Sequence, residues 1–181
     1  MLLGGSALVS AGATEPGVSA IFGAAKSDVA RIACFARSYS AAHLEQHPIQ
    51  NVRSMTLLVY KPDRAPASRP YAMLAGVKFK TRTERFDNYG ECTSANGDVG
   101  PFDCRLECDA GHVRLRKDSG TTIYVEVPAG SHLRECGEDV GSFGADDRTF
   151  KLERVKASAC LPLVPPSEAM QYLRDRLSKA N

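Results

Sequence analysis

The sequence lacks tryptophan, a strong excess of either charge, and any apolar run long enough for a membrane helix. Its 181 residues carry a formal net charge of +2, which is too small to indicate a nucleic acid or another polyanion as partner. No apolar stretch reaches the roughly 18 residues that a membrane-spanning helix needs, so we expect no transmembrane span. The hydrophobic share of 43% and the charged share of 24% are ordinary for a globular protein and argue against global disorder.

The common catalytic motifs are missing as well. The sequence contains no nucleophile elbow, no phosphate-binding loop and no dinucleotide-binding fingerprint. These absences do not exclude an enzyme, but they make a binding function the better prediction, and we expect no cofactor. The length fits one domain that can bury a substantial core.

The start of the chain bears on its compartment. Residues 1–13 are uncharged, apolar or small, and end in Ala11-Gly12-Ala13, a pattern typical of a secretory signal and its cleavage site. The basic start of such a signal is missing, so we interpret this stretch as a signal remnant. Residues 14–26 are small and polar and predict a flexible lead-in. Because six cysteines also suit an oxidising compartment, we expect a periplasmic or secreted protein.

The clearest pattern lies between residues 92 and 136, where short alternating segments are separated by links such as Asp109-Ala110-Gly111. Alternation places apolar side chains on one face of a strand, and glycine in a short link permits a tight hairpin. The pattern predicts a four-strand meander over about residues 102–136. Four further strands are expected at residues 52–60, 71–84, 86–92 and 149–155.

Eight antiparallel strands tend to close on themselves, because closure removes exposed sheet edges. We therefore predict an all-β meander or barrel of about eight strands, lipocalin-like in shape, over residues 27–164. The segment 27–39 fits a short helix or a strand equally well. Ser40 is expected to cap a helical turn over residues 41–46, and residues 165–181 to form a helix lying against the barrel. The apolar stripe of that last helix is Met170, Leu173 and Leu177.

Six cysteines allow 15 disulfide connectivities. Cys92 and Cys104 flank a hairpin symmetrically, which favours a bond across the two strands, while Cys34 and Cys160 flank the whole strand block. The favoured set is Cys34–Cys160, Cys92–Cys104 and Cys108–Cys136. This set leaves no free thiol.

Two histidines, His43 and His47, stand four residues apart, so a helical turn would place them on one face. Such a pair can bind a metal ion, although the zinc-protease spacing H-E-x-x-H is absent and no third ligand can be placed. The alternative interpretation is two surface or packing histidines.

An eight-stranded barrel has an interior just wide enough for its own side chains or for one small ligand. The candidate ligand-binding residues are Met55, Leu57, Val77, Phe79, Leu115, Ile123 and Val125. Most of them are of medium size, so the interior is either partly open to an apolar ligand or a packed core.

The runs Cys104-Arg-Leu-Glu-Cys108-Asp-Ala-Gly111 and Asp146-Asp147-Arg-Thr-Phe-Lys-Leu152 resemble those of a group of small exported bacterial proteins, which carry C-x-x-x-C-D-x-G and D-D-x-x-F-x-L segments. The likeness covers most of residues 34–160. It implies a fold and an exported location, and it implies no activity.

Three functional hypotheses follow. The first is a non-catalytic exported binding module for a small apolar ligand or an envelope component. The second is a protein that docks on another protein through loops such as Lys61–Pro70 and Gly137–Asp147. The third is a metal-dependent hydrolase that uses His43 and His47.

Overall fold

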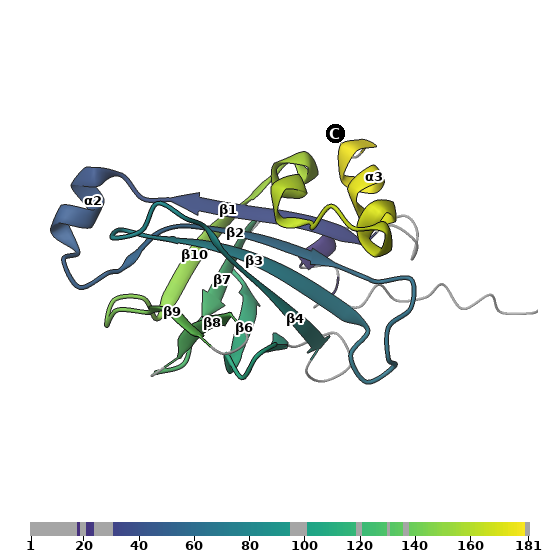
Figure 1. The fold of residues 1–181 in the computed structure, drawn as a ribbon, viewed down its shortest axis with the longest axis horizontal. Helices are drawn as coiled ribbons and strands as arrows, with labels where there is room; N and C mark the ends of the chain where they lie inside the picture. Colours follow the sequence, from purple (N-terminus) through teal and green to yellow (C-terminus); the bar gives the residue numbers. More distant parts are fainter. Residues whose placement is uncertain are drawn as a thin grey trace, which may run out of the picture.

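Eight antiparallel strands form a closed barrel in the computed structural model (Figure 1). The structure describes Val18 and residues 21–23, 31–94, 101–118, 121–129, 131–135 and 138–179, with the side chains of 132–140 excepted. The barrel strands are β1 (Ile32–Ser38), β2 (Val52–Tyr60), β3 (Tyr71–Phe79), β4 (Phe86–Ser94), β5 (Phe102–Leu106), β6 (His112–Lys117), β7 (Thr122–Glu126) and β10 (Thr149–Val155). The other elements are β8 (His132–Glu135), β9 (Glu138–Ser142), α2 (Ala41–Gln46), α3 (Gln171–Lys179) and the 3₁₀ turns η2 (Ala157–Leu163) and η3 (Glu168–Met170).

Closure is made by β1, which pairs with β2 on one side and with β10 on the other. Consecutive strands from β2 to β7 are neighbours, and β10 completes the ring by pairing with β7. The prediction of an all-β antiparallel barrel with a C-terminal helix is therefore confirmed. The short helix α2 is also confirmed: the hydroxyl of Ser40 accepts a hydrogen bond from the backbone N–H of His43 at 3.2 Å.

The set of eight strands differs from the predicted one. The segment 32–38 is a barrel strand, whereas β8, predicted as the fourth strand of the meander, pairs with β9 in a separate two-stranded sheet. The strand predicted over 71–84 ends at Phe79. Ala33, Cys34 and Phe35 are all buried, because β1 is covered on both faces, and this removes the alternation that identifies a half-exposed strand.

The barrel interior is a packed apolar core. Phe35, Phe102 and Phe150 are among its largest fully buried side chains. At the end of the barrel where β2 ends and β3 begins, Phe22 packs against Tyr71 and Phe102, with ring centroids 5.6 and 6.2 Å apart.

The described residues of the predicted flexible lead-in belong to this core. Val18, Ile21 and Phe22 are at most 9% exposed, so the prediction for segment 14–26 is wrong at these positions. The three positions are spaced as on one face of a helix, and their side chains belong to the same apolar cluster as the barrel core. The guanidinium of Arg154 donates a hydrogen bond to the Ile21 carbonyl and lies over the Phe35 ring at 4.9 Å. Residues 1–13, the predicted signal remnant, lie outside the described residues.

The opposite end of the barrel is held by Asp147, a fully buried carboxylate. It accepts hydrogen bonds from the backbone N–H groups of Asn51 (2.7 Å), Val52 (3.2 Å) and Gly144 (2.8 Å). A carboxylate that satisfies three backbone donors joins the start of β2 to the loop before β10. Gly144 is required here, because a Cβ atom would lie 1.9 Å from the Ile49 carbonyl oxygen.

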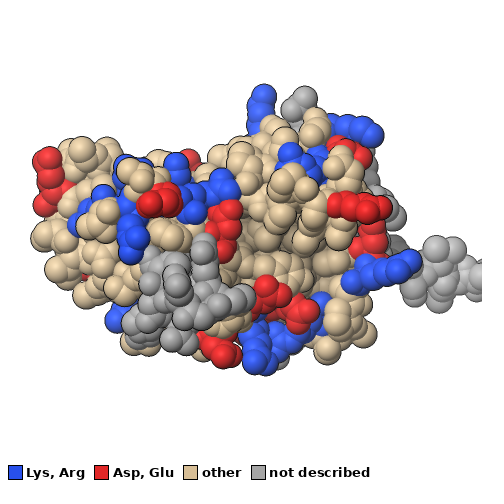
Figure 2. Space-filling view, viewed as in Figure 1, with Lys and Arg blue, Asp and Glu red and all other residues tan. Residues whose placement is uncertain are grey.

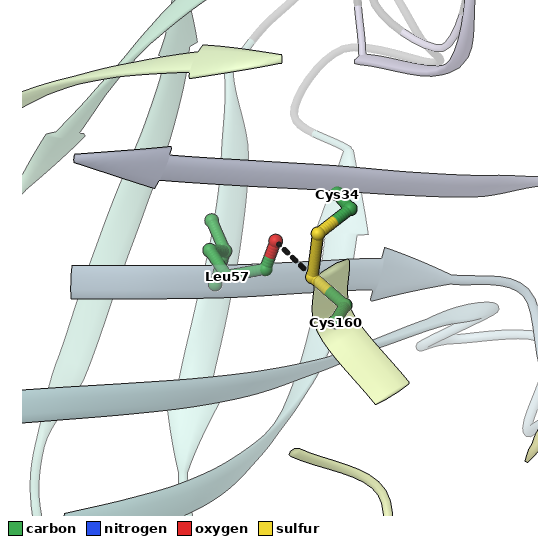
Figure 3. Close-up of a disulfide and its surroundings, with 3 residues drawn as sticks. All are labelled: Cys34, Leu57 and Cys160. Atoms are coloured by element: carbon green, nitrogen blue, oxygen red, sulfur yellow. Dashed lines mark hydrogen bonds between the residues drawn. A yellow bond between two sulfur atoms is a disulfide. The ribbon is translucent and has the colours of Figure 1, made fainter. Parts of the chain in front are cut away.

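The C-terminal segment packs on the outer face of β1–β4, where Leu163, Leu173 and Leu177 are buried (Figure 1). The Cys34–Cys160 disulfide ties this segment to β1, and the sulfur of Cys160 lies 3.4 Å from the Leu57 carbonyl oxygen (Figure 3). A disulfide sulfur carries no proton, so we read this approach as a close contact.

Two of the three favoured disulfides, Cys34–Cys160 and Cys92–Cys104, are present. Cys108 is disulfide-bonded, and its predicted partner Cys136 lies outside the described residues. Cys108 and Asp109 both have positive φ, at 57° and 56°, and form the centre of the turn between β5 and β6. Disulfides of this kind are typical of an oxidising compartment.

Candidate functional site

A hollow of about 510 Å³ lies between the β2–β3 loop, the adjacent ends of β2–β4 and the C-terminal helices; we call it the tyrosine groove. It is lined by Tyr60, Pro62, Asp63, Arg64, Ala65, Pro66, Arg69, Tyr71, Tyr89, Glu91, Ala169, Met170 and Tyr172. Its volume lies within the ~300–1,000 Å³ range of small-ligand sites. The Lys61–Pro70 loop, predicted as a docking loop, forms one wall.

The strand register brings residues of three strands to the same part of the outer face. Tyr60 of β2 pairs with Ala72 of β3, and Ala72 pairs with Glu91 of β4, so the three side chains form a row across the outer face. The middle position carries only a methyl group. One register step away, Tyr89 pairs with Leu74, which belongs to the cluster under the C-terminal helices. Ala72 is buried and does not line the hollow, whereas Tyr60 and Glu91 on either side of it do.

Tyr60 is the most informative residue of the groove. It is 2% exposed, and its side chain lines the groove. Tyr89 and Tyr172 also line the groove and are partly buried. A tyrosine combines an apolar ring with a hydroxyl that donates and accepts, so three tyrosines around one hollow offer a ligand both kinds of contact.

Burial raises the pKa of Tyr60 well above the ordinary value of a tyrosine, and the nearby Tyr89 and Tyr172 raise it further. Burial also raises the pKa of Tyr89, with contributions from Glu91, Glu107 and Tyr172. For Tyr172, burial and Asp63 raise the pKa, whereas Arg176 lowers it. With its pKa raised, each of the three hydroxyls stays protonated at neutral pH.

The charged residues of the groove balance. Arg64 and Arg69 are offset by Asp63 and Glu91. A guanidinium nitrogen of Arg69 donates to the backbone carbonyl of Glu91 at 3.4 Å, which fixes the loop to the edge of β4. Asp63 lies 3.8 Å from Arg176 of α3, which connects the loop to the helix. The lining of the groove is thus polar and aromatic and carries no formal net charge, with Arg176 beside it at Asp63.

A second hollow of about 590 Å³ lies over β5 and β6 and includes Arg69, Arg105, His112 and Arg114. Arg114 pairs with Asp103 at 3.0 Å, so part of its charge is neutralised. Across the face drawn in Figure 2, positive and negative side chains are interspersed. No buried polar side chain lines this second hollow, so it is the weaker candidate.

The seven predicted lumen residues are all buried. Met55, Leu57, Val77, Phe79, Leu115, Ile123 and Val125 are at most 3% exposed and belong to one apolar cluster. None of them lines either hollow. The structure uses them as core, so they give no support to an open binding lumen.

His43 and His47 lie side by side, as predicted, but their rings are stacked with centroids 4.3 Å apart. Nε2 of His43 is 3.1 Å from Oε1 of Gln50, and Nδ1 of His47 is 3.6 Å from a carboxylate oxygen of Asp146. In the part of the chain that the structure describes, no group of three His, Cys, Asp or Glu side chains is arranged for a metal ion. Stacking between Tyr39 and His43 continues the row, which is a packing arrangement.

Comparison of the chain with protein-family models, curated proteins and solved structures finds no match. The resemblance to small exported bacterial proteins therefore stays a prediction. Among the described helices, none has the length and apolarity needed to cross a membrane.

Sequence reasoning missed the groove altogether. Tyr60, Tyr89 and Tyr172 come from β2, β4 and α3, and no local pattern connects them. A signal did exist at Tyr60, which continues the apolar run Leu57-Leu58-Val59. A strand end that is apolar on both faces indicates that its outer face is covered, here by the C-terminal segment.

Proposed function

We propose that this protein is a non-catalytic binding module of the periplasm or the extracellular space, and that its ligand site is the tyrosine groove. The observation that carries the proposal is the groove itself, a hollow of about 510 Å³ that three tyrosines line together with two arginines and two carboxylates. A concave site with aromatic walls and a few polar groups is the usual form of a ligand site.

The location rests on the disulfides and on the sequence of residues 1–13. Disulfides persist in oxidising compartments and are rare in a reducing cytosol. Because the barrel interior is packed, we propose the site on the outer wall of the barrel instead. A site on the outer wall is polar, so we favour an envelope component over a small apolar ligand.

The test is native mass spectrometry of the protein purified from its own compartment, beside the variant Ala169→Trp. Ala169 is exposed and lines the groove, so an indole there fills the hollow without entering the core. We expect a ligand mass on the wild-type protein that the variant lacks. A ligand that the variant keeps, or a wild-type protein that carries no ligand, contradicts the proposal.

A second candidate is docking on another protein, because the Lys61–Pro70 loop contributes Arg64 and Arg69 to a groove that is also lined by tyrosines, and these two residue types dominate protein interfaces. The same experiment separates the two: a stoichiometric protein partner lost in Ala169→Trp supports docking. The metal-dependent hydrolase gains no support from His43 and His47, and we do not propose it.

A further inference from the structure

Resting on the proposed function, we infer that the ligand of the tyrosine groove is an uncharged oligosaccharide. The geometry that carries this inference is the convergence of three protonated phenol groups, two arginines and two carboxylates on one neutral hollow. Each property of the groove restricts the chemistry of the ligand.

The charged side chains of the groove lining restrict the charge of the ligand. Arg64 and Arg69 face Asp63 and Glu91, so the lining carries no formal net charge. A phosphate or a polyanion needs an excess of donors and positive charge, and an ammonium ligand needs an excess of acceptors. Neither excess is present, which favours an uncharged ligand.

The groove lining contains both hydrogen-bond donors and hydrogen-bond acceptors. A tyrosine hydroxyl both donates and accepts, arginine only donates, and a carboxylate only accepts. The groove offers all three kinds within one hollow, through Tyr60, Tyr89 and Tyr172, the two arginines and the two carboxylates. Sugar hydroxyls also donate and accept at the same atom, so an array of mixed character satisfies them.

The apolar part of the lining completes the match. Pro62, Pro66 and Met170 line the groove together with the partly buried side chains of Tyr89 and Tyr172. A pyranose ring presents C–H groups on its faces and hydroxyls at its edge, and the electron-rich face of an aromatic ring attracts such C–H groups. Exposed Arg64 and Ala169 border the groove, so a longer chain can extend beyond it.

A proline-rich peptide is the alternative that shares the aromatic requirement, because such peptides dock in aromatic-lined grooves. A polyproline segment has no side-chain donor and offers only carbonyl acceptors. It would leave the carboxylates of Asp63 and Glu91 without a new partner, so the acceptors of the groove favour the saccharide.

The test is titration of the purified protein with four probes, followed by calorimetry and by NMR: cellotetraose, the tetramer of N-acetylglucosamine, a heparin hexasaccharide and a decaproline peptide. We expect one of the neutral saccharides to bind. Tyr172→Phe should weaken it about 2–12-fold, the effect of one hydrogen bond, and Tyr172→Ala should weaken it further. The matched control is Tyr124→Phe, because Tyr124 lies on the outer face of β7, away from the groove.

The outcomes separate the two proposals. Binding of the heparin hexasaccharide in preference to both neutral saccharides, or of decaproline alone, overturns the saccharide inference. Failure of both neutral saccharides overturns it as well, and if native mass spectrometry then still shows a ligand that Ala169→Trp loses, the binding function stands. Saccharide binding that Tyr172→Ala leaves unchanged refutes the groove as the site.

Discussion

At the scale of single residues, Asp147 joins two parts of the chain that are almost 100 positions apart. Its carboxylate accepts three backbone hydrogen bonds inside the protein, whereas its neighbour Asp146 is exposed and lies 3.6 Å from His47. Asp147→Asn places an amide N–H₂ group among donors. We expect a loss of about 1–3 kcal/mol in the free energy of unfolding, measured by urea denaturation.

Asp146→Asn is the matched control, because it changes the same functional group one residue earlier. Surface ion pairs contribute about 0–1 kcal/mol, so this control should cost less than the change at Asp147. Equal losses in the two variants would show that the carboxylate of Asp147 has no special structural role.

The groove tyrosines predict a dependence of stability on alkaline pH. Burial raises the pKa of Tyr60, Tyr89 and Tyr172 in the folded state, so the unfolded chain releases these protons first, near the ordinary value of about 10. Their contribution to stability is complete below pH ~10 and is lost as pH rises through the folded pKa values. Urea midpoints should therefore fall as pH rises above about 10.

The readout that isolates this effect is tyrosinate absorbance at 295 nm. We expect part of the tyrosinate absorbance of the folded protein to appear at higher pH than that of the protein unfolded in urea. Tyr60→Phe should remove the part of that signal that titrates at the highest pH. It should also make stability fall less steeply as pH rises above about 10. A titration curve that is identical in the folded and unfolded protein would contradict the burial of these hydroxyls.

At the scale of elements, the two disulfides close loops of very different length. Cys34 and Cys160 are 126 positions apart, and Cys92 and Cys104 are 12 apart. In the chain-entropy account, a 100-residue loop contributes about 4.7 kcal/mol and a 15-residue loop about 3 kcal/mol. We expect Cys34→Ala/Cys160→Ala to lose about 1.5–2 kcal/mol more than Cys92→Ala/Cys104→Ala.

Hydrogen exchange gives a second, local readout of the same comparison. The long-range disulfide attaches the C-terminal segment to β1, so its removal should raise amide exchange in α3 more than in β5. The short-range variant should show the reverse pattern. Uniform exchange in both variants would mean that the C-terminal segment stays on the barrel without its covalent link.

Element by element, the sequence predicted those strands that keep one face toward the core and the other toward water. β6 and β7 show this clearly, with Val113, Leu115, Ile123 and Val125 buried between more exposed neighbours. β1 stayed ambiguous because both of its faces are covered, one by the core and one by η2. The exclusion of β8 from the barrel depends on β10 taking the place beside β7, which no local pattern encodes.

At the scale of the whole molecule, the sequence predicted a barrel and left open whether its interior is filled. Candidate lumen residues and core residues are the same residues, so composition could not decide between them. The deciding observation is that Val18, Ile21 and Phe22 enter from outside the predicted domain. The groove was equally out of reach, because it forms only when the C-terminal helices pack on β2–β4.

The packed interior leads to a prediction about access. Phe22 packs against both Tyr71 and Phe102 at one end of the barrel, so Phe22→Ala should cost about 3 kcal/mol in the free energy of unfolding and loosen that end. The folded wild-type protein should not enhance the fluorescence of an apolar dye, whereas the double variant Ile21→Ala/Phe22→Ala should do so below its unfolding midpoint.

Ile49→Ala is the control, because Ile49 is 54% exposed and its truncation should change stability by at most about 0.5 kcal/mol and leave dye binding unchanged. Dye binding by the wild-type protein equal to that of the double variant would mean that apolar ligands already reach the interior, and it would return the binding site to the lumen.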